Sequence, residues 1–249
     1  MILSGHQPVY LPGVILFNKI ALSDTFMFVG HCQLSNKSWH TRNRIRLGDR
    51  EFMLSVPVKK EQGQSINETQ ILEDGWQKKH LGSIRQAYGK RPFFSEYFPQ
   101  IEALLCTRWP SLGDMNISII KSMLDWFDIK TPILDSREYH VTGNKTDMLI
   151  SMCRAAGASQ YLSNEGARDY VDEAAMAEAG ILHSWQIFTH PTYNQNAAFM
   201  ENMSAIDLLF NMGPEAGGLI RECGRIEPGA GRPTWAQEGV AGLRLEQAQ

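Results

Sequence analysis

The stretch that decides the fold is residues 1–46, MILSGHQPVYLPGVILFNKIALSDTFMFVGHCQLSNKSWHTRNRIR. Residues 1–4 are a short apolar run, and residues 14–22 carry apolar side chains at helical spacing, at positions 14, 17, 20 and 21. Residues 25–29 are apolar and rich in strand formers, which predicts a strand buried on both faces. The order strand, loop, helix, strand is that of a right-handed crossover in a parallel sheet.

Two histidines follow the two predicted strands. His6 ends the first and His31 the second, and ligands of open parallel sheets bind outside the carboxyl ends of the strands, so we expect both to face one crevice. Pro12 and Gly13 lead into the helix, whose free N–H groups attract an anion. This corner is a candidate phosphate site. The alternative is that each histidine is structural and closes a turn or the core.

A basic segment follows His31. Arg42, Arg44 and Arg46 alternate, so a strand here would place three guanidinium groups on one face, with Lys37 and Trp39 just before them. Such a face suits phosphates or carboxylates, which arginine binds bidentately. The alternative is a solvated edge strand that is protected by its charges.

The remaining chain predicts helices and then a return to alternating strands and helices. Residues 52–58 would complete a hairpin, and helices are expected in a helical insertion over residues 61–131, at 75–89, 93–108 and 112–128. After it we expect strands and helices in turn, at 132–135, 146–156, 160–163, 171–179, 182–188 and 204–211. The fold class is therefore α/β, a Rossmann-like parallel sheet with a β-hairpin and an all-helical insertion. Residues 1–213 would form one domain and 214–249 a loosely ordered tail rich in Gly and Pro.

Further candidates stand at the ends of these later elements. Asn164 and His190 end strands as His6 does, and Glu165 is a carboxylate suited to general-base or metal work, or else a helix-start acid. Lys145 and the helix start after it could meet a phosphate, with Thr146 as cap or ligand. An ordinary capped helix start is the alternative.

Composition sets limits on the function. A net charge of -3 argues against a nucleic-acid partner that is bound through phosphate contacts. No apolar run is long enough for a membrane span and no leader precedes the first strand, so we expect a cytoplasmic protein. The four cysteines lack any zinc spacing, and no protein-bound metal is expected. Cys32, next to His31, is either a nucleophile or a small buried side chain.

The opening stretch also resembles the start of the WbqC-like family, small bacterial proteins associated with O-antigen and secondary-metabolite gene clusters. The resemblance rests on residues 5–12, 17–20, 23–24, 33, 39 and 43–45, and it continues in 56–58, 145–146, 157–158, 161–163, 190–195 and 204–211. It spans about residues 1–213. Polar residues in these motifs are further candidates for substrate or phosphate binding: Gln7, Tyr10, Lys19, Gln33, Asn43, Tyr193 and Gln195.

A second similarity bears on the mechanism. Residues 10–29 are laid out like the strand, HxGH loop, helix and strand of nucleotidylyltransferases and pantothenate synthetases, with Tyr10 and Gly13 in place of the two histidines. This layout, and the family's occurrence in pathways that decorate amino sugars, imply transfer of an acyl or aminoacyl group to an amine. The donor could be an adenylate made from ATP with Mg²⁺, and the substrate a small anion. The alternatives are a non-catalytic nucleotide-sugar or partner-binding module, and an acyltransferase that uses Cys32 and an acyl thioester.

Overall fold

The opening stretch folds into the unit that its pattern predicts. The computed structural model describes residues 1–35, 38–59, 61–233 and 236. In it, β1 (Ile2–His6) and β2 (Thr25–Phe28) are parallel neighbours that α1 (Val14–Ala21) connects. Phe26 and Phe28 pack on one side of the sheet and Met27 on the other, so both sides of β2 are covered. This burial explains a strand without polar alternation.

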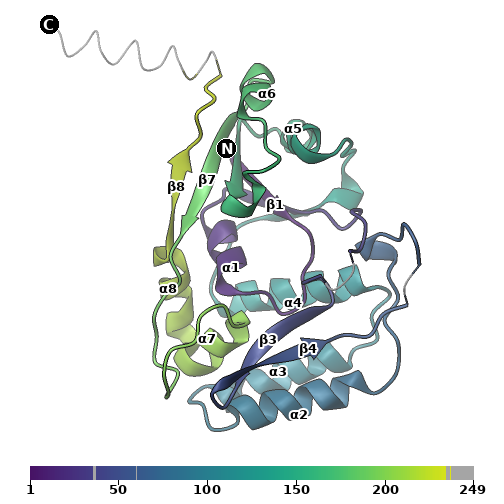
Figure 1. The fold of residues 1–249 in the computed structure, drawn as a ribbon, viewed down its shortest axis with the longest axis vertical. Coiled ribbons are helices and arrows are strands. Elements are labelled where there is room, and N and C mark those ends of the chain that lie inside the picture. The colour runs from purple at the N-terminus through teal and green to yellow at the C-terminus, as the bar shows by residue number, and fades with distance from the viewer. Residues whose placement is uncertain (36–37, 60, 234–235, 237–249) are drawn as a thin grey trace, which may run out of the picture.

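The main sheet has six strands in the order β5-β2-β1-β6-β7-β8, and only the β7–β8 pair is antiparallel (Figure 1). The later strands are β5 (Ile133–Asp135), β6 (Gln160–Asn164), β7 (Leu182–Phe188) and β8 (Gly224–Pro228). From β1 the chain first builds outward through β2 to β5, and it then returns to add β6 on the other side of β1. The carboxyl end of β1 is therefore a topological switch point, where open α/β sheets bind ligands.

Helices cover both faces of this sheet. On one face lie α5 (Lys145–Ala156) and α6 (Glu173–Glu178), which bury Leu3 and Met27 in one hydrophobic cluster. On the other face, α1 packs against α8 (Ala216–Glu222). Short 3₁₀ turns lie between the elements, at Ile66–Glu68, Ser136–Glu138, Glu165–Ala167 and Gly213–Glu215. Among the described residues, no helix is both long and apolar enough to cross a bilayer.

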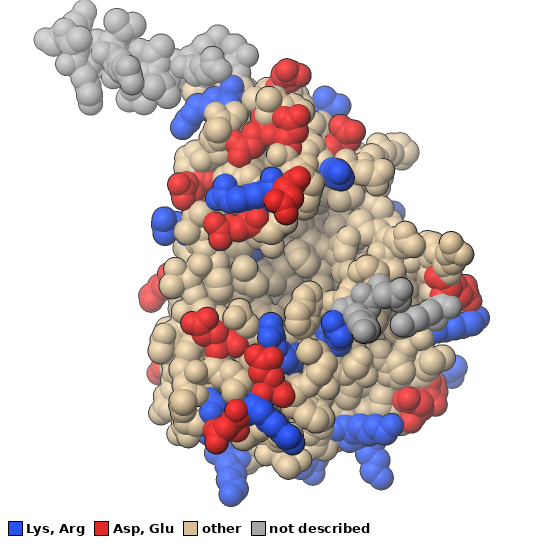
Figure 2. All heavy atoms as spheres, viewed as in Figure 1, with Lys and Arg blue, Asp and Glu red and all other residues tan. Residues whose placement is uncertain are grey.

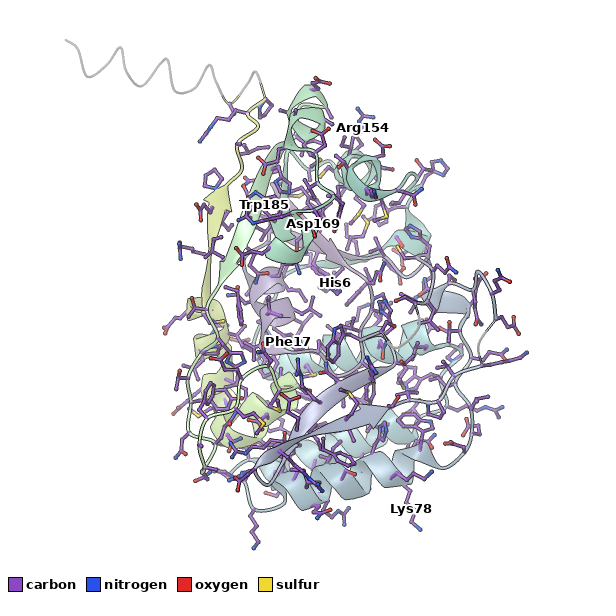
Figure 3. The ribbon with its side chains drawn as sticks, viewed as in Figure 1. His6, Phe17, Lys78, Arg154, Asp169 and Trp185 are labelled. Atoms are coloured by element: carbon purple, nitrogen blue, oxygen red, sulfur yellow. The ribbon has the colours of Figure 1, made fainter. Side chains whose placement is uncertain are left out.

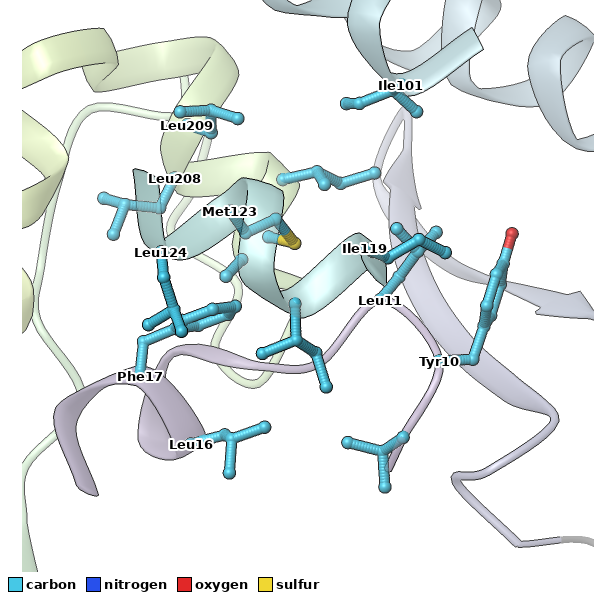
Figure 4. Packing of buried hydrophobic residues seen from close by; sticks show 14 of the residues in the cluster. Tyr10, Leu11, Leu16, Phe17, Ile101, Ile119, Met123, Leu124, Leu208 and Leu209 are labelled. Atoms are coloured by element: carbon cyan, nitrogen blue, oxygen red, sulfur yellow. The ribbon is translucent and has the colours of Figure 1, made fainter. Parts of the chain in front are cut away.

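The predicted hairpin and helical insertion are also present. A separate two-stranded sheet is formed by β3 (Arg42–Leu47) and β4 (Arg50–Ser55), and Gly48, at φ 65°, permits the tight turn between them. The helices beside it are α2 (Trp76–Tyr88), α3 (Phe94–Cys106), α4 (Leu112–Trp126) and α7 (Ala205–Met212). They share one hydrophobic cluster with α1, as the packing around Phe17 and Met123 shows (Figure 4). The helical segment is thus part of the main core.

The prediction of a loosely ordered tail is wrong for residues 214–228. Ala216 and Ile220 of α8 are fully buried, and Asn18 of α1 donates a hydrogen bond to the carbonyl oxygen of Ile220. Strand β8 then pairs with β7 from Ser184 to Phe188. A run rich in glycine is compatible with this order because the small residues allow close contact: a Cβ at Gly217 would lie 2.0 Å from the carbonyl oxygen of Phe127.

Candidate functional site

A cleft of about 560 Å³ opens at the carboxyl ends of β1 and β7. Figure 2 shows a hollow in the middle of this face of the molecule, with charged side chains gathered mainly above and below it. We call this space the main cleft. Its walls come from the loop after β1, the start of α1, the start of the hairpin and the segment after β7: His6, Gln7, Val9, Pro12, Gly13, Val14, Ile15, Leu16, Ser35, Ser38, Trp39, His40, Asn43, Arg44, Phe188, His190, Asn202 and Met203.

The charge of the main cleft favours an anion. Among the described residues, Arg44 is the one formally charged side chain that lines it, and no described carboxylate does. Gly13, Val14 and Ile15 bring the N-terminus of α1 to the cleft, and Gly13 has an extended conformation without a side-chain cap. The partial positive charge of a helix N-terminus adds to that of the guanidinium.

His6 is held in a defined tautomer. Its Nδ1 lies 2.7 Å from the carbonyl oxygen of Gln7, and because a carbonyl oxygen only accepts, Nδ1 carries the proton. Burial, and next the positive charge of Lys19, lower the pKa of His6 to about 4. The ring is therefore neutral at physiological pH, and its Nε2 offers a lone pair. Figure 3 shows His6 near the centre of the molecule, between the labelled Phe17 and Asp169.

Two more histidines of the main cleft are fixed in the same way. His40 donates from Nδ1 to the carbonyl oxygen of Pro8 at 3.0 Å, and His190 donates to that of Pro191 at 3.0 Å. His190 also makes edge-to-face contacts with Phe188 and Phe199. In each ring Nε2 is the nitrogen left for a ligand. The described parts of the chain bring together no group of three or more His, Cys, Asp or Glu side chains that could hold a metal.

The arginine face of β3 is divided among three environments. The guanidinium of Arg42 lies 5.9 Å from the ring centre of Trp39, and that of Arg44 lies 5.2 Å from it. Nη1 of Arg44 also binds both carboxylate oxygens of Glu51, at 2.9 and 3.1 Å. Arg46 is buried and donates to Gln195, so it is structural. The predicted three-arginine face thus reaches the main cleft through Arg44 alone.

A second, smaller space of about 310 Å³ adjoins the same loop. We call it the inner cavity. His6 and Gln7 line it as well as the main cleft. The other walls come from β1, the end of β2, α1, α5, β6 and the segment after β6: Gly5, Lys19, Val29, Met148, Leu149, Met152, Tyr161, Ser163, Asn164, Gly166, Ala167 and Tyr170. The two spaces therefore meet at His6 and Gln7.

The fold brings many of the predicted site residues together from distant parts of the sequence. His6, Gln7, Trp39, Asn43, Arg44 and His190 line the main cleft, and His6, Gln7, Lys19 and Asn164 line the inner cavity. Asn43 is also structural, since its Nδ2 donates to the carbonyl oxygens of Tyr10 and Leu11. Arg42 lines neither space but contacts Trp39.

Four predicted residues lie outside both spaces on the surface. His31 is exposed and its Nδ1 contacts the hydroxyl of Ser136, and Gln33 is exposed beside Ser65. Glu165 is exposed and pairs with Arg168 at 3.6 Å. Lys145 is exposed at the start of α5. The expectation that His31 shares the crevice with His6 is wrong. His31 follows β2, which lies between β1 and β5, whereas the main cleft lies on the β7 side of β1.

Four other predicted residues are structural. Tyr10 is fully buried and its hydroxyl bonds to Nδ1 of His80. The hydroxyl of Thr146 donates to the carbonyl oxygen of Tyr170 and accepts from the N–H of Asp172, so it clamps a loop. Tyr193 donates to Asp207, and Gln195 donates to Tyr193. Ordered hydrogen bonds occupy these groups, which leaves none of them for a phosphate. Lys37 lies outside the described residues.

His40 is one cleft residue that the sequence patterns missed. It lies between Trp39 and the alternating arginines, where the charged neighbours drew attention instead. A second missed group is Ser38, whose hydroxyl is buried without a partner in the described structure. Adjacency to Trp39 was the one available signal for both.

Cys32 has the properties of an unreactive thiol. It is half-buried, lines neither the main cleft nor the inner cavity, and burial raises the pKa of its thiol. A nucleophilic cysteine needs a lowered pKa so that thiolate is present at neutral pH. These observations disfavour the thioester alternative.

The fold and site define a Rossmann-like α/β protein with an anion-receptive cleft at its topological switch point. The chain belongs to the WbqC-like protein family, whose model matches residues 7–218. It is 30% identical over 224 residues to an uncharacterized protein of Mycobacterium tuberculosis, Rv1507c, and the match covers 87% of this chain and 96% of that protein. A comparison with solved structures gave no match.

Proposed function

We propose that this chain is a biosynthetic transferase or ligase that moves an acyl or aminoacyl group from an activated donor, such as an acyl adenylate, to an amine. The observation that carries the proposal is the position of His6. A neutral imidazole with its Nε2 available stands where the main cleft meets the inner cavity. That arrangement suits a base that takes a proton between two bound substrates.

In this mechanism the phosphate of the donor lies in the main cleft. Arg44 and the N-terminus of α1 provide positive charge there, and Trp39 and Phe188 provide flat apolar surface. The amine nitrogen attacks the acyl carbon, the new C–N bond forms, and the bond from that carbon to the phosphate oxygen of AMP breaks. AMP leaves with the bonding electrons, and Nε2 of His6 accepts the proton that the amine loses.

The residues that line the main cleft also bear on whether the protein itself would hold the Mg²⁺ of a bound ATP. Magnesium prefers oxygen ligands, above all carboxylates, and none of the described residues that line the main cleft is a carboxylate. The residues therefore do not fit a protein-held Mg²⁺ site, and no step of the mechanism is assigned to one. The histidine rings that line the cleft instead offer Nε2 lone pairs, which can accept hydrogen bonds from the hydroxyl groups of a ribose.

The test is a search for turnover with the purified full chain. It would be incubated with ATP, Mg²⁺ and pools of carboxylic acids and amines, and mass spectrometry would detect amide together with AMP. Ready-made acyl adenylates would replace ATP and acid in a parallel series. Amide that depends on the chain would support the proposal. Tight binding of a nucleotide or nucleotide sugar without any amide would instead support the binding-module alternative.

A further inference from the structure

The inner cavity contains a buried cation. Lys19 points from α1 to the end of β1, is 4% exposed, and donates from Nζ to the carbonyl oxygen of Gly5 at 2.9 Å. An ammonium group has three N–H donors, and the described structure gives Nζ of Lys19 one hydrogen-bond partner. A ligand in the cavity that Lys19 lines could use the other two donors.

No acid within the described chain balances this charge. None of the ion pairs there includes Lys19, and no Asp or Glu lines the inner cavity. Burial lowers the pKa of Lys19 to about 8, with no carboxylate to raise it again. A buried charge without a partner is costly, and proteins keep one mainly where a ligand or function uses it.

The other walls limit the kind of anion. Val29, Met148, Leu149 and Met152 give one apolar side, and Gln7, Asn164 and Tyr170 supply polar groups without formal charge. A single cation balances a single negative charge, so a di- or triphosphate would leave charge unpaired. The volume of about 310 Å³ is at the small end for ligand pockets.

We propose that the inner cavity is a binding site for a compact monocarboxylate with an apolar body, whose carboxylate pairs with Lys19 while its carbon chain lies against Met148 and Met152. This ligand class is a substrate class for the proposed transferase, and to that extent the inference deepens the proposed function. The carboxylate would also offset the positive charge that acts on His6. Its binding is measurable without turnover, so the two proposals can fail separately.

The experiment compares 4-methylpentanoate with 4-methylpentanamide, a neutral molecule of nearly the same shape. Calorimetry at pH 7 should detect binding of the acid to the full chain. The amide should bind at least tenfold more weakly. The affinity of the Lys19→Met variant for the acid should be lower than that of the parent by tenfold or more. Lys121→Met, at an exposed position on α4, should leave the affinity unchanged. Equal affinity for acid and amide, or no binding of the acid, would overturn the proposal.

A pH series with the parent chain keeps the test decisive if Lys19→Met does not fold. Dissociation constants for the acid should be constant up to about pH 8 and then rise up to tenfold per pH unit, because Lys19 loses its proton there. Burial lowers the pKa values of His6 and His183 to about 4 and raises those of Tyr161, Tyr170 and Cys32 above their ordinary values, so Lys19 is the group expected to lose its proton near pH 8. Constant affinity to pH 10, or preference for inorganic phosphate over the acid, would contradict the assignment.

Discussion

At the scale of single residues, the site is defined by hydrogen bonds that fix ring orientation. His6, His40 and His190 each bind a backbone carbonyl through Nδ1, so the fold fixes which nitrogen faces the ligand. Tyr10 and Tyr193 are equally prominent in the sequence, but their hydroxyl groups form hydrogen bonds inside the core. Residue type alone does not separate these two groups.

The first prediction ranks His6 against Cys32. His6→Gln should lower the rate of amide formation by a factor of about 10² to 10⁴, the usual contribution of a general base. Cys32→Ala should keep the parent rate, because its thiol has a raised pKa and lines neither space. Single-turnover rates on ready-made acyl adenylate measure both. A folded Cys32→Ala variant without turnover would favour the thioester mechanism instead.

The second prediction concerns Arg44. Arg44→Lys keeps the charge but loses the planar guanidinium, so affinity for a phosphate-bearing donor should fall by about 1.5 to 3 kcal/mol, roughly tenfold to over a hundredfold. Arg50→Lys, exposed on the same hairpin, is the matched control and should change affinity little. Titration of each variant with the donor measures the two affinities, provided that the melting temperature of the variant equals that of the parent. Affinity within twofold of the parent for both variants would make Arg44 only the partner of Glu51.

At the scale of elements, the C-terminal helix and strand are tied to the opening unit by one side chain. Asn18 of α1 donates to the carbonyl oxygen of Ile220 in α8 and accepts from Gln186 in β7. A Cβ at Gly224 would lie 2.2 Å from Oδ1 of Asn18, so the start of β8 needs glycine there. The segment after residue 213 therefore packs against α1 and helps to cover the face of the sheet on which α1 lies.

A third prediction follows from the burial of α8. Ile220→Ala removes a fully buried side chain and should lower the free energy of unfolding by about 2 to 5 kcal/mol. Leu219→Ala, at a partly exposed neighbour on the same helix, should cost clearly less. Urea denaturation of the two variants measures the difference. Equal and small losses would mean that α8 adds nothing to the core.

At the scale of the whole molecule, buried histidines make stability depend on pH. His80 and His183 are buried, and burial lowers the pKa of each to about 4. In the unfolded chain these rings take up a proton below about pH 6.5. Between pH 4 and 6.5 the unfolded state therefore binds more protons, so stability rises with pH in this window and is fully present above it.

The fourth prediction is the size of this effect. Each ring contributes a slope of at most about 1.4 kcal/mol per pH unit between pH 5 and 6.5, where ordinary carboxylates stay ionised. The free energy of unfolding should therefore fall measurably on acidification through this range. His183→Gln should reduce the slope, because it removes one of the rings with a lowered pKa. A flat profile in the parent chain would show that these rings are free to ionise in the folded state.

The sequence by itself determined the elements and their class. Apolar periodicity in residues 14–22 and 25–29 and the alternation of strands and helices suffice for a parallel α/β sheet, because burial on a fixed period is a local property of the chain. The ends of β1 and β7 could also be identified, and with them His6 and His190. The resemblance to the family added Gln7, Lys19 and Asn43.

Only the tertiary structure decided which polar groups are free to bind. The strand order separates His31 from the main cleft. Side-chain hydrogen bonds occupy Thr146, Tyr193 and Gln195. Arg44 forms an ion pair with Glu51. It also revealed that Lys19 is buried without an acid in the described chain. Each of these outcomes depends on which groups from distant parts of the chain come within about 3 Å, a distance that no local pattern encodes.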